Sequence, residues 1–215
     1  MLSQGASDMG VNLSDSETGQ LMSYLSMLIK WNKAYNLTAI RDPEKMISLH
    51  LLDSLIVHRH LSGQRVLDVG TGPGLPGIVL AIMNPEHQFT LLDSNGKKTR
   101  FLFQVVTSLG LKNVTIVNDR VEAFRPDSPF DTITSRAFAS LLDMVNWCHH
   151  LLSAEGEFLA MKGQYPKQEI DDLPPGFKVL NSTPLFVPGV DGDRHLLRIH
   201  QLRPSSGSQG LEAPL

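Results

Sequence analysis

The chain has 215 residues, of which 41% are apolar and 19% charged, and its formal net charge is −3. These values are ordinary for a globular protein that buries a core, and they exclude an overall basic signature while leaving room for a local basic patch. The single cysteine, Cys148, excludes an internal disulfide, and no apolar run approaches the roughly 18 residues that a membrane span needs. We therefore expect a protein of the reducing cytoplasm that does not enter a membrane.

Residues 1–63 are predicted to form a helical segment that packs on the rest of the chain. Residues 1–12 are polar and contain glycine, which predicts loose chain. A first helix is expected over residues 14–34, because a serine or an aspartate can cap its start and apolar residues recur on one face. A second helix is expected over residues 42–62, with proline at its first position.

Strands alternate with helices from residue 64 to residue 202, and this order predicts an α/β fold with a parallel sheet and right-handed crossovers. Five strands are expected over residues 65–70, 88–94, 113–118, 130–137 and 156–163. The helices between them are expected to end near residues 84, 110 and 152. Two further β-rich runs, 177–188 and 193–202, are predicted to form an antiparallel hairpin that turns at residues 189–192. The tail, 203–215, is predicted to be disordered.

The stretch VLDVGTGPGLPGIVL, Val66–Leu80, leads from a strand through a glycine-rich loop into a helix. Such a loop lets a ligand approach the backbone closely, and the N-terminus of the helix offers free N–H groups. We therefore expect a nucleotide-like ligand. A P-loop for ATP or GTP is excluded, because Ile78 and Val79 stand where a lysine and a hydroxyl residue are required.

Two cofactors fit this loop. NAD requires G-x-G-x-x-G and an acidic residue about 20 positions later, a pattern matched by Gly72, Gly74, Gly77 and Asp93. S-adenosyl-L-methionine requires an acidic residue before three spaced glycines, a pattern matched by Asp68, Gly70, Gly72 and Gly74. The Asp68 carboxylate can bind the ammonium of the methionyl group but would repel an NAD pyrophosphate. We favour S-adenosyl-L-methionine, with Asp93 binding both ribose hydroxyls, and keep an NAD-dependent oxidoreductase as the alternative.

Six stretches of the chain resemble the RsmG (GidB) family of bacterial 16S rRNA guanine-N7 methyltransferases: KWNKAYNLTAIRDP, HLLDSL, DVGTGPGLPGI, TLLDSNGKKTRFL, SRAFASL and DGDRHL. The resemblance implies a class I, Rossmann-like methyltransferase domain over residues 64–202 that uses S-adenosyl-L-methionine. The implied substrate is a guanosine in the 530 loop of 16S rRNA, position 527 in the rRNA numbering, within the RNA or the small ribosomal subunit. The cofactor contacts of the family carry over to Gly70, Leu75, Val121, Glu122 and Arg136.

Guanine N7 carries a lone pair and no proton, so its methylation needs no general base, and we expect catalysis by positioning. Arg136, at the end of the fourth strand, is the expected catalytic residue, because an arginine there can orient the substrate or the cofactor. The structural alternative is an ion pair of Arg136 with Asp131 or Glu122. A further functional alternative is a non-catalytic protein that binds a nucleotide and the ribosome.

Contacts to RNA are expected from six residues: Lys30, Lys33, Arg41, Lys162, Arg194 and His195. Trp31 and Tyr35 lie among the first three, and we expect them to pack in the core rather than stack on bases. For Lys162 the alternative is a solvated strand end, and for Arg194 an ion pair with one of the aspartates beside it. No metal site is expected, because neighbouring histidines do not share a helix face. We expect a monomer.

Overall fold

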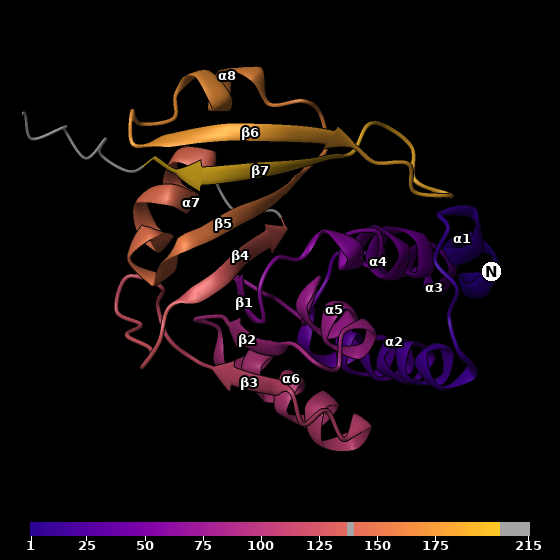
Figure 1. Ribbon diagram of the computed structural model, residues 1–215. Helices are drawn as coiled ribbons and strands as arrows, with labels where there is room; N and C mark the ends of the chain where they lie inside the picture. Colours follow the sequence, from indigo (N-terminus) through magenta and orange to yellow (C-terminus); the bar gives the residue numbers. More distant parts are fainter. Residues whose placement is uncertain (137–139, 203–215) are drawn as a thin grey trace, which may run out of the picture.

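The computed structural model describes residues 1–136 and 140–202. Residues 137–139 of the stretch SRAFASL and the tail 203–215, predicted to be disordered, lie outside the described residues. Within the described ranges one sheet of seven strands has the order β3-β2-β1-β4-β5-β7-β6 (Figure 1). Its strands are β1 (Arg65–Val69), β2 (Gln88–Leu92), β3 (Val114–Val117), β4 (Phe130–Arg136), β5 (Leu152–Lys162), β6 (Phe177–Pro184) and β7 (His195–Gln201). No helix in these ranges is long and apolar enough to cross a bilayer.

The strands β1 to β5 are parallel, β7 pairs antiparallel with β5, and β6 pairs antiparallel with β7. In the register, Asp68 of β1 lies opposite Leu91 of β2 and Thr134 of β4. This confirms the predicted, mostly parallel sheet with a terminal antiparallel pair. Because parallel strands share one carboxyl edge, the last residues of β1, β2, β3, β4 and β5 lie along that edge.

The helices form two layers, one on each face of the sheet (Figure 1). They are α1 (Leu2–Asp8), α2 (Asp15–Tyr35), α3 (Pro43–Met46), η1 (Ile47–Leu52), α4 (Asp53–Leu55), η2 (His58–His60), α5 (Gly77–Met83), α6 (Gly96–Leu109), α7 (Leu141–Cys148), η3 (His149–Leu151) and α8 (Lys167–Asp171). The N-terminal helices, α5 and α6 share one apolar core with Val66 and Leu91. Helix α7 shares the other with Leu67 and Ile133. Successive strand residues point to opposite faces, which is why Val66 and Leu67 belong to different cores.

The N-terminal segment is more ordered than its sequence predicts. Residues 2–8 form helix α1 rather than loose chain, because Ala6 and Val11 are buried in the core that the segment shares with the sheet. The predicted first helix is confirmed as α2. Ser14 caps it through a capping box with Glu17.

The predicted continuous helix over residues 42–62 is wrong. Asp42 caps its start, but α3 ends at Met46, and the π-helical turn η1 follows before α4 and η2. A π-helical turn closes with i→i+5 hydrogen bonds, so it changes the direction of the side chains after it, and such turns are frequent at functional sites. The sequence does not signal this turn, because its apolar residues fit an α-helix equally well.

The two terminal strands pair as predicted, but the predicted turn at residues 189–192 does not join them. Strand β6 ends at Pro184 and β7 begins at His195, so the connection spans residues 185–194. This longer loop packs on the N-terminal segment, and Val187 is buried in the core of that segment. Burying Val187 removes apolar surface from water that a short hairpin turn would leave exposed.

Candidate functional site

A buried carboxylate at the end of β1 holds the glycine loop. Asp68 is fully buried, and its Oδ2 accepts hydrogen bonds from Thr71 Oγ1 (2.6 Å) and from the backbone N–H of Gly77 (2.8 Å). Burial raises the pKa of Asp68 to about 7, against the opposing effect of these hydrogen bonds. Its Oδ1 has no hydrogen-bond partner among the described residues. The carboxylate therefore closes the loop with one oxygen and keeps the other for a further donor.

Two glycines of this loop are required by its geometry. Gly77 begins α5, and a Cβ there would lie 2.2 Å from Leu91 Cδ2 and 2.7 Å from Asp68 Oδ2. Gly72 has a φ of +61°, which strains any other residue, and a Cβ there would meet nothing nearer than Lys98 Nζ at 3.9 Å. A Cβ at Gly72 would make only ordinary van der Waals contacts, so the constraint at this position comes from the backbone conformation. Among the glycines of the loop, Gly70 is exposed.

Asp93, at the end of β2, is the second buried carboxylate of this edge. Its Oδ1 accepts from the N–H of Asn95 (2.8 Å) and its Oδ2 from the N–H of Gly72 (2.9 Å), with Lys98 Nζ 3.7 Å away. Asn118 Nδ2 donates to the carbonyl oxygen of Asp93 (2.9 Å) and fixes the strand end. A carboxylate has about four acceptor positions, so Asp93 can bind hydroxyl groups while it holds the loop.

A cavity of about 420 Å³ opens beside the ends of β1, β2 and β3. We call it the strand-end cavity, and its lining includes Gly70, Asp93, Lys98, Asp119, Glu122 and Trp147. Four predicted cofactor residues meet there: Gly70, Asp93, Val121 and Glu122. The other four of the loop, Asp68, Gly72, Gly74 and Leu75, are buried and do not line the cavity.

The strand-end cavity fits a nucleoside cofactor that carries a positive charge better than one that carries a pyrophosphate. Three carboxylates line it, those of Asp93, Asp119 and Glu122, against the two cations of Lys98 and Arg120. The Oδ1 of Asp68 has no hydrogen-bond partner among the described residues, and it is buried behind the lining of this cavity.

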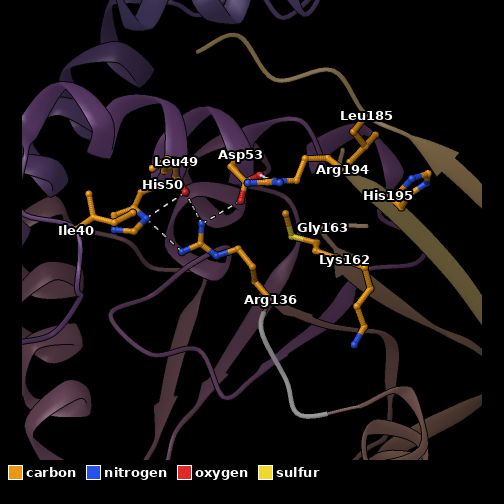
Figure 2. A pocket seen from close by; sticks show the side chains of 11 residues that line it. Ile40, Leu49, His50, Asp53, Arg136, Lys162, Gly163, Leu185, Arg194 and His195 are labelled. Carbon is orange, nitrogen blue, oxygen red and sulfur yellow. Dashed lines mark hydrogen bonds and ion pairs between the residues drawn. The ribbon is translucent and has the colours of Figure 1, made fainter. Parts of the chain in front are cut away.

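A second cavity, of about 440 Å³, lies at the ends of β4 and β5 (Figure 2). We call it the arginine pocket, and its polar side chains are His50, Asp53, Arg136, Lys162, Arg194 and His195. Arg136 ends β4 and donates to the carbonyl oxygen of Leu49 (2.7 Å) and to Asp53 Oδ2 (3.1 Å). The preceding residue, Ser135, donates from Oγ to the carbonyl oxygen of Val69 (2.9 Å). This bond ties the pocket to the end of β1, where the glycine loop starts.

The partner of Arg136 is not one that the sequence indicates. The alternative considered from the sequence, an ion pair of Arg136 with Asp131 or Glu122, is wrong. Asp131 accepts backbone N–H groups at the start of β1, at the opposite edge of the sheet. Glu122 is exposed and lines the strand-end cavity. Asp53 pairs with Arg136 instead, and it comes from the N-terminal segment, 83 positions earlier.

Asp53 also binds the second arginine of the pocket. Arg194 donates from Nε to Asp53 Oδ1 (2.9 Å), while it reaches only the backbone oxygen of Asp193 (2.8 Å). The alternative ion pair of Arg194 with a neighbouring aspartate is therefore wrong. Lys162 points away from this group (Figure 2) and binds Glu169 Oε2 at 2.7 Å, so it is not a solvated strand end.

The two histidines of the pocket differ in their surroundings. His50 is buried, with Nε2 2.9 Å from Thr38 Oγ1, and burial together with Arg136 lowers its pKa to about 4. His50 is therefore neutral near pH 7. His195 begins β7, and its ring meets that of Tyr165 edge-on at 5.5 Å. Within the part of the chain that the structure describes, no group of three His, Cys, Asp or Glu side chains could hold a metal ion.

The three N-terminal cations lie outside the two larger cavities. Lys30, Lys33 and Arg41 are exposed, and the last two flank a smaller cavity of about 230 Å³. Trp31 is half-buried and packs against the core, as predicted. Tyr35 is 42% exposed, with its ring 5.2 Å from that of Trp31, so its predicted burial is wrong.

The residues that line the two cavities but were not predicted from the sequence include Asp53, Lys98, Asp119 and Trp147. Lys98 and Asp119 follow the ends of β2 and β3 closely, and that position is a signal that could have found them. Asp53 and Trp147 lie on helices far from the glycine loop in sequence. Only the three-dimensional fold brings these two to the edge of the sheet.

Comparison with known proteins places this site in a family. The chain matches the family model described as rRNA small subunit methyltransferase G over residues 17–197. It is 54% identical over 198 residues to the Ribosomal RNA small subunit methyltransferase G of Aeromonas hydrophila, which covers 92% of each chain. It is 57% identical over 190 residues to the protein of the same name from Erwinia tasmaniensis, which covers 88% of this chain and 93% of the relative.

Solved structures show the same fold at low sequence identity. The glycopeptide N-methyltransferase MtfA has a TM-score of 0.60 at 15% identity, over 74% of this chain and 100% of that one. A SAM-dependent methyltransferase from Aquifex aeolicus has a TM-score of 0.54 at 19% identity, over 74% of this chain and 97% of that one. The predicted class I, Rossmann-like methyltransferase fold is confirmed.

Proposed function

Because the chain belongs to the rRNA small subunit methyltransferase G family, we propose that it transfers a methyl group from S-adenosyl-L-methionine to N7 of a guanosine in the 530 loop of 16S rRNA, at position 527. Family membership makes the chain a methyltransferase of small-subunit rRNA, and the donor, the atom and the nucleotide are the proposal. One observation carries it. The strand-end cavity, which suits a charged nucleoside, and the arginine pocket, which suits a base and its phosphates, open at the same edge of the sheet.

The strand-end cavity supplies the residues that would hold the cofactor. Asp93 would accept hydrogen bonds from the ribose hydroxyls, with Gly70, Val121 and Glu122 beside the nucleoside. The free Oδ1 of Asp68 would accept from the ammonium group. The conformation of the loop would depend on its remaining residues, Gly72, Gly74 and Leu75.

For methylation at N7, the protein has to orient the guanine and the cofactor. When bound, S-adenosyl-L-methionine supplies a sulfonium methyl group: the N7 lone pair forms the new N–C bond as the S–C pair stays with sulfur, and the positive charge passes to the guanine. No proton leaves, so no side chain has to act as a base. Arg136 would orient the substrate from the end of β4, where it is already fixed by Leu49 and Asp53.

The RNA would extend from the arginine pocket over the N-terminal segment. Arg194, His195 and Lys162 belong to the pocket, and Lys30, Lys33 and Arg41 would meet phosphates farther away. Arg194 and Lys162 each have an acidic partner, so the three exposed N-terminal cations are the freer phosphate contacts.

Methyl transfer to defined RNA tests the proposal. The protein is incubated with labelled S-adenosyl-L-methionine and 16S rRNA that lacks the modification, and the labelled nucleoside is then identified and mapped. We expect N7-methylguanosine at position 527, revealed also by borohydride reduction and aniline cleavage. Label in another nucleotide, in protein or in a small molecule would overturn it.

The two alternatives fare differently. An NAD-dependent oxidoreductase is set aside, since the chain belongs to a methyltransferase family. A protein that binds the cofactor without turnover would show S-adenosylhomocysteine binding but no label in the RNA, so the same experiment separates it from the enzyme.

A further inference from the structure

The arginine pocket holds a carboxylate that the chemistry proposed above does not use. The side chain of Asp53 is 8% exposed, and it lies between Arg136 and Arg194, whose side chains are 20% and 24% exposed (Figure 2). Each of its oxygens accepts one of these arginine donors. An ionised carboxylate has about four acceptor positions, so two remain after both ion pairs are formed.

Asp53 is also the only acidic side chain among the described residues that line this pocket. Two guanidinium groups border the same space, while His50 is neutral near pH 7 and Lys162 is held by Glu169. The apolar lining comes from residues such as Ile40, Leu49, Met161 and Leu185. The pocket thus offers one strong acceptor flanked by donors, within apolar walls that suit the faces of a ring.

This arrangement matches guanine better than any other RNA base. The Watson–Crick edge of guanine presents two adjacent donors, N1–H and the N2 amino group, next to the O6 acceptor. A carboxylate beside a guanidinium is the complement of that edge, as unstacked RNA bases are recognised through hydrogen bonds to their edges. Adenine would place its N1 lone pair against the carboxylate, and two acceptors facing each other repel.

We propose that the arginine pocket is the binding site of the target guanine and that Asp53 selects it by accepting hydrogen bonds from N1–H and the N2 amino group. This inference rests on the proposed function and names the residue that would give it base specificity. Accepted this way, the base keeps N7 free for the reaction. The carboxylate also faces a base that becomes cationic on methylation, so its attraction grows along the reaction.

Replacing the target guanosine by inosine tests the contact, because inosine lacks only the N2 amino group. Both 16S RNAs are made by ligation, and two quantities are measured: the dissociation constant without cofactor and the methylation rate. The wild type should prefer guanosine about tenfold or more, since a hydrogen bond to a charged group is lost. Asp53→Asn should prefer it by less than about threefold, because the amide leaves at most a neutral hydrogen bond to the N2 amino group in place of the charge-assisted one.

Glu157 provides the matched control. It is a buried carboxylate in the middle of β5 that pairs with Arg198 and His200, outside both cavities. Glu157→Gln removes a comparable buried charge and should keep the full preference for guanosine. If Asp53→Asn does not fold, the preference of the wild type for guanosine over inosine still tests the inference, because that measurement needs no variant.

Equal binding and methylation of the two RNAs by the wild type would overturn the inference. So would a folded Asp53→Asn variant that keeps the full preference. In either case the appearance of N7-methylguanosine in natural RNA leaves the proposed function intact. Absence of that product with the wild type would instead show that the proposed function itself fails.

Discussion

The two cavities lie at the same edge of the sheet but are built in different ways. The strand-end cavity is shaped by backbone, since Asp68 and Asp93 accept N–H groups from the segments that follow β1 and β2. The arginine pocket is shaped by charged side chains, because Asp53 holds Arg136 and Arg194 from distant parts of the chain. From this difference we expect cofactor binding to be lost when the backbone conformation of the loop changes. RNA binding should respond to charge and salt.

The largest expected effect comes from the backbone of the glycine loop. Gly72→Val should abolish S-adenosylhomocysteine binding, a loss of more than about 100-fold, because a β-branched residue at a φ of +61° strains the loop and displaces the N–H that Asp93 accepts. Calorimetric titration measures it. Gly110→Val is the control: Gly110 has a φ of +64° with nothing within 4 Å of a Cβ, so it suffers the same backbone strain away from the site. Equal loss in both variants would show that strain alone is responsible.

Asp93→Ala should have the next largest effect. The loss of hydrogen bonds to the ribose should weaken S-adenosylhomocysteine binding by on the order of 1.5–3 kcal/mol, roughly 10- to 150-fold. Asp131→Ala is its counterpart, because Asp131 likewise accepts two backbone N–H groups, at 2.9 and 3.0 Å, but at the opposite edge of the sheet. Unchanged affinity in Asp93→Ala would reject its assignment to the cofactor.

The two cavities differed in how far the sequence could predict them. Gly70, Asp93, Val121 and Glu122 follow the ends of successive strands, and the order of strands in an α/β fold brings such positions together. Local patterns therefore sufficed for Gly70 and Asp93, whereas Val121 and Glu122 were expected from the resemblance to the family. Arg136 was found through its strand, but its partner Asp53 was not. No pairing rule joins a π-helical turn and its neighbours to a strand end 83 positions away.

The same contrast explains the errors in the fold. The alternating strands and helices were predictable because their periodicity is local. Helix α1 and the 185–194 loop were not, because each is ordered by burying Ala6 or Val187 in a core assembled from remote segments. In such places tertiary packing decides the local structure, and a polar or glycine-containing sequence gives no warning of it.

The free energy of unfolding should depend on pH in opposite ways through Asp68 of the glycine loop and His50 of the arginine pocket. Burial raises the pKa of Asp68 from 3.8 to about 7, so its protonated form favours folding. This contribution is fully present below about pH 4 and is lost as the pH rises through about 7. Urea unfolding of Asp68→Asn between pH 4 and 7 should therefore remove a pH dependence on the order of 1 kcal/mol per pH unit.

His50 serves as a control, because its contribution to stability changes with pH in the opposite direction. Its pKa falls from 6.5 to about 4, so its neutral form favours folding, and this contribution is lost as the pH falls from 6.5 through about 4. His50→Gln should flatten the acid side of the stability profile. If Asp68→Asn and wild type have parallel profiles, Asp68 is ionised throughout and holds the loop as a plain carboxylate.

A smaller effect is expected from salt. Each phosphate contact that is lost should reduce the slope of log affinity against log salt by about 0.7 for single-stranded RNA. Lys30→Gln, Lys33→Gln and Arg41→Gln should each show this change. Arg194→Gln should show less, since Asp53 already neutralises Arg194. Lys112→Gln, at an exposed lysine before β3, should leave the slope unchanged.

The smallest effect is expected from pH on the chemical step. N7 brings its own lone pair, so single-turnover methyl transfer at saturating ligands should vary by less than about twofold between roughly pH 6.5 and 8.5. Rapid-quench measurements across this range check it. A steep rise that follows one ionisation would indicate a base, and hence an exocyclic amine or hydroxyl target.

Paired titrations test most directly whether the two cavities divide the cofactor from the RNA. Dissociation constants for S-adenosylhomocysteine and for 16S rRNA are measured on the same preparations of wild type, Asp93→Ala and Arg194→Gln. We expect Asp93→Ala to lose cofactor affinity and keep RNA affinity, and Arg194→Gln to do the reverse. Loss of cofactor affinity in Arg194→Gln as large as in Asp93→Ala would contradict this division.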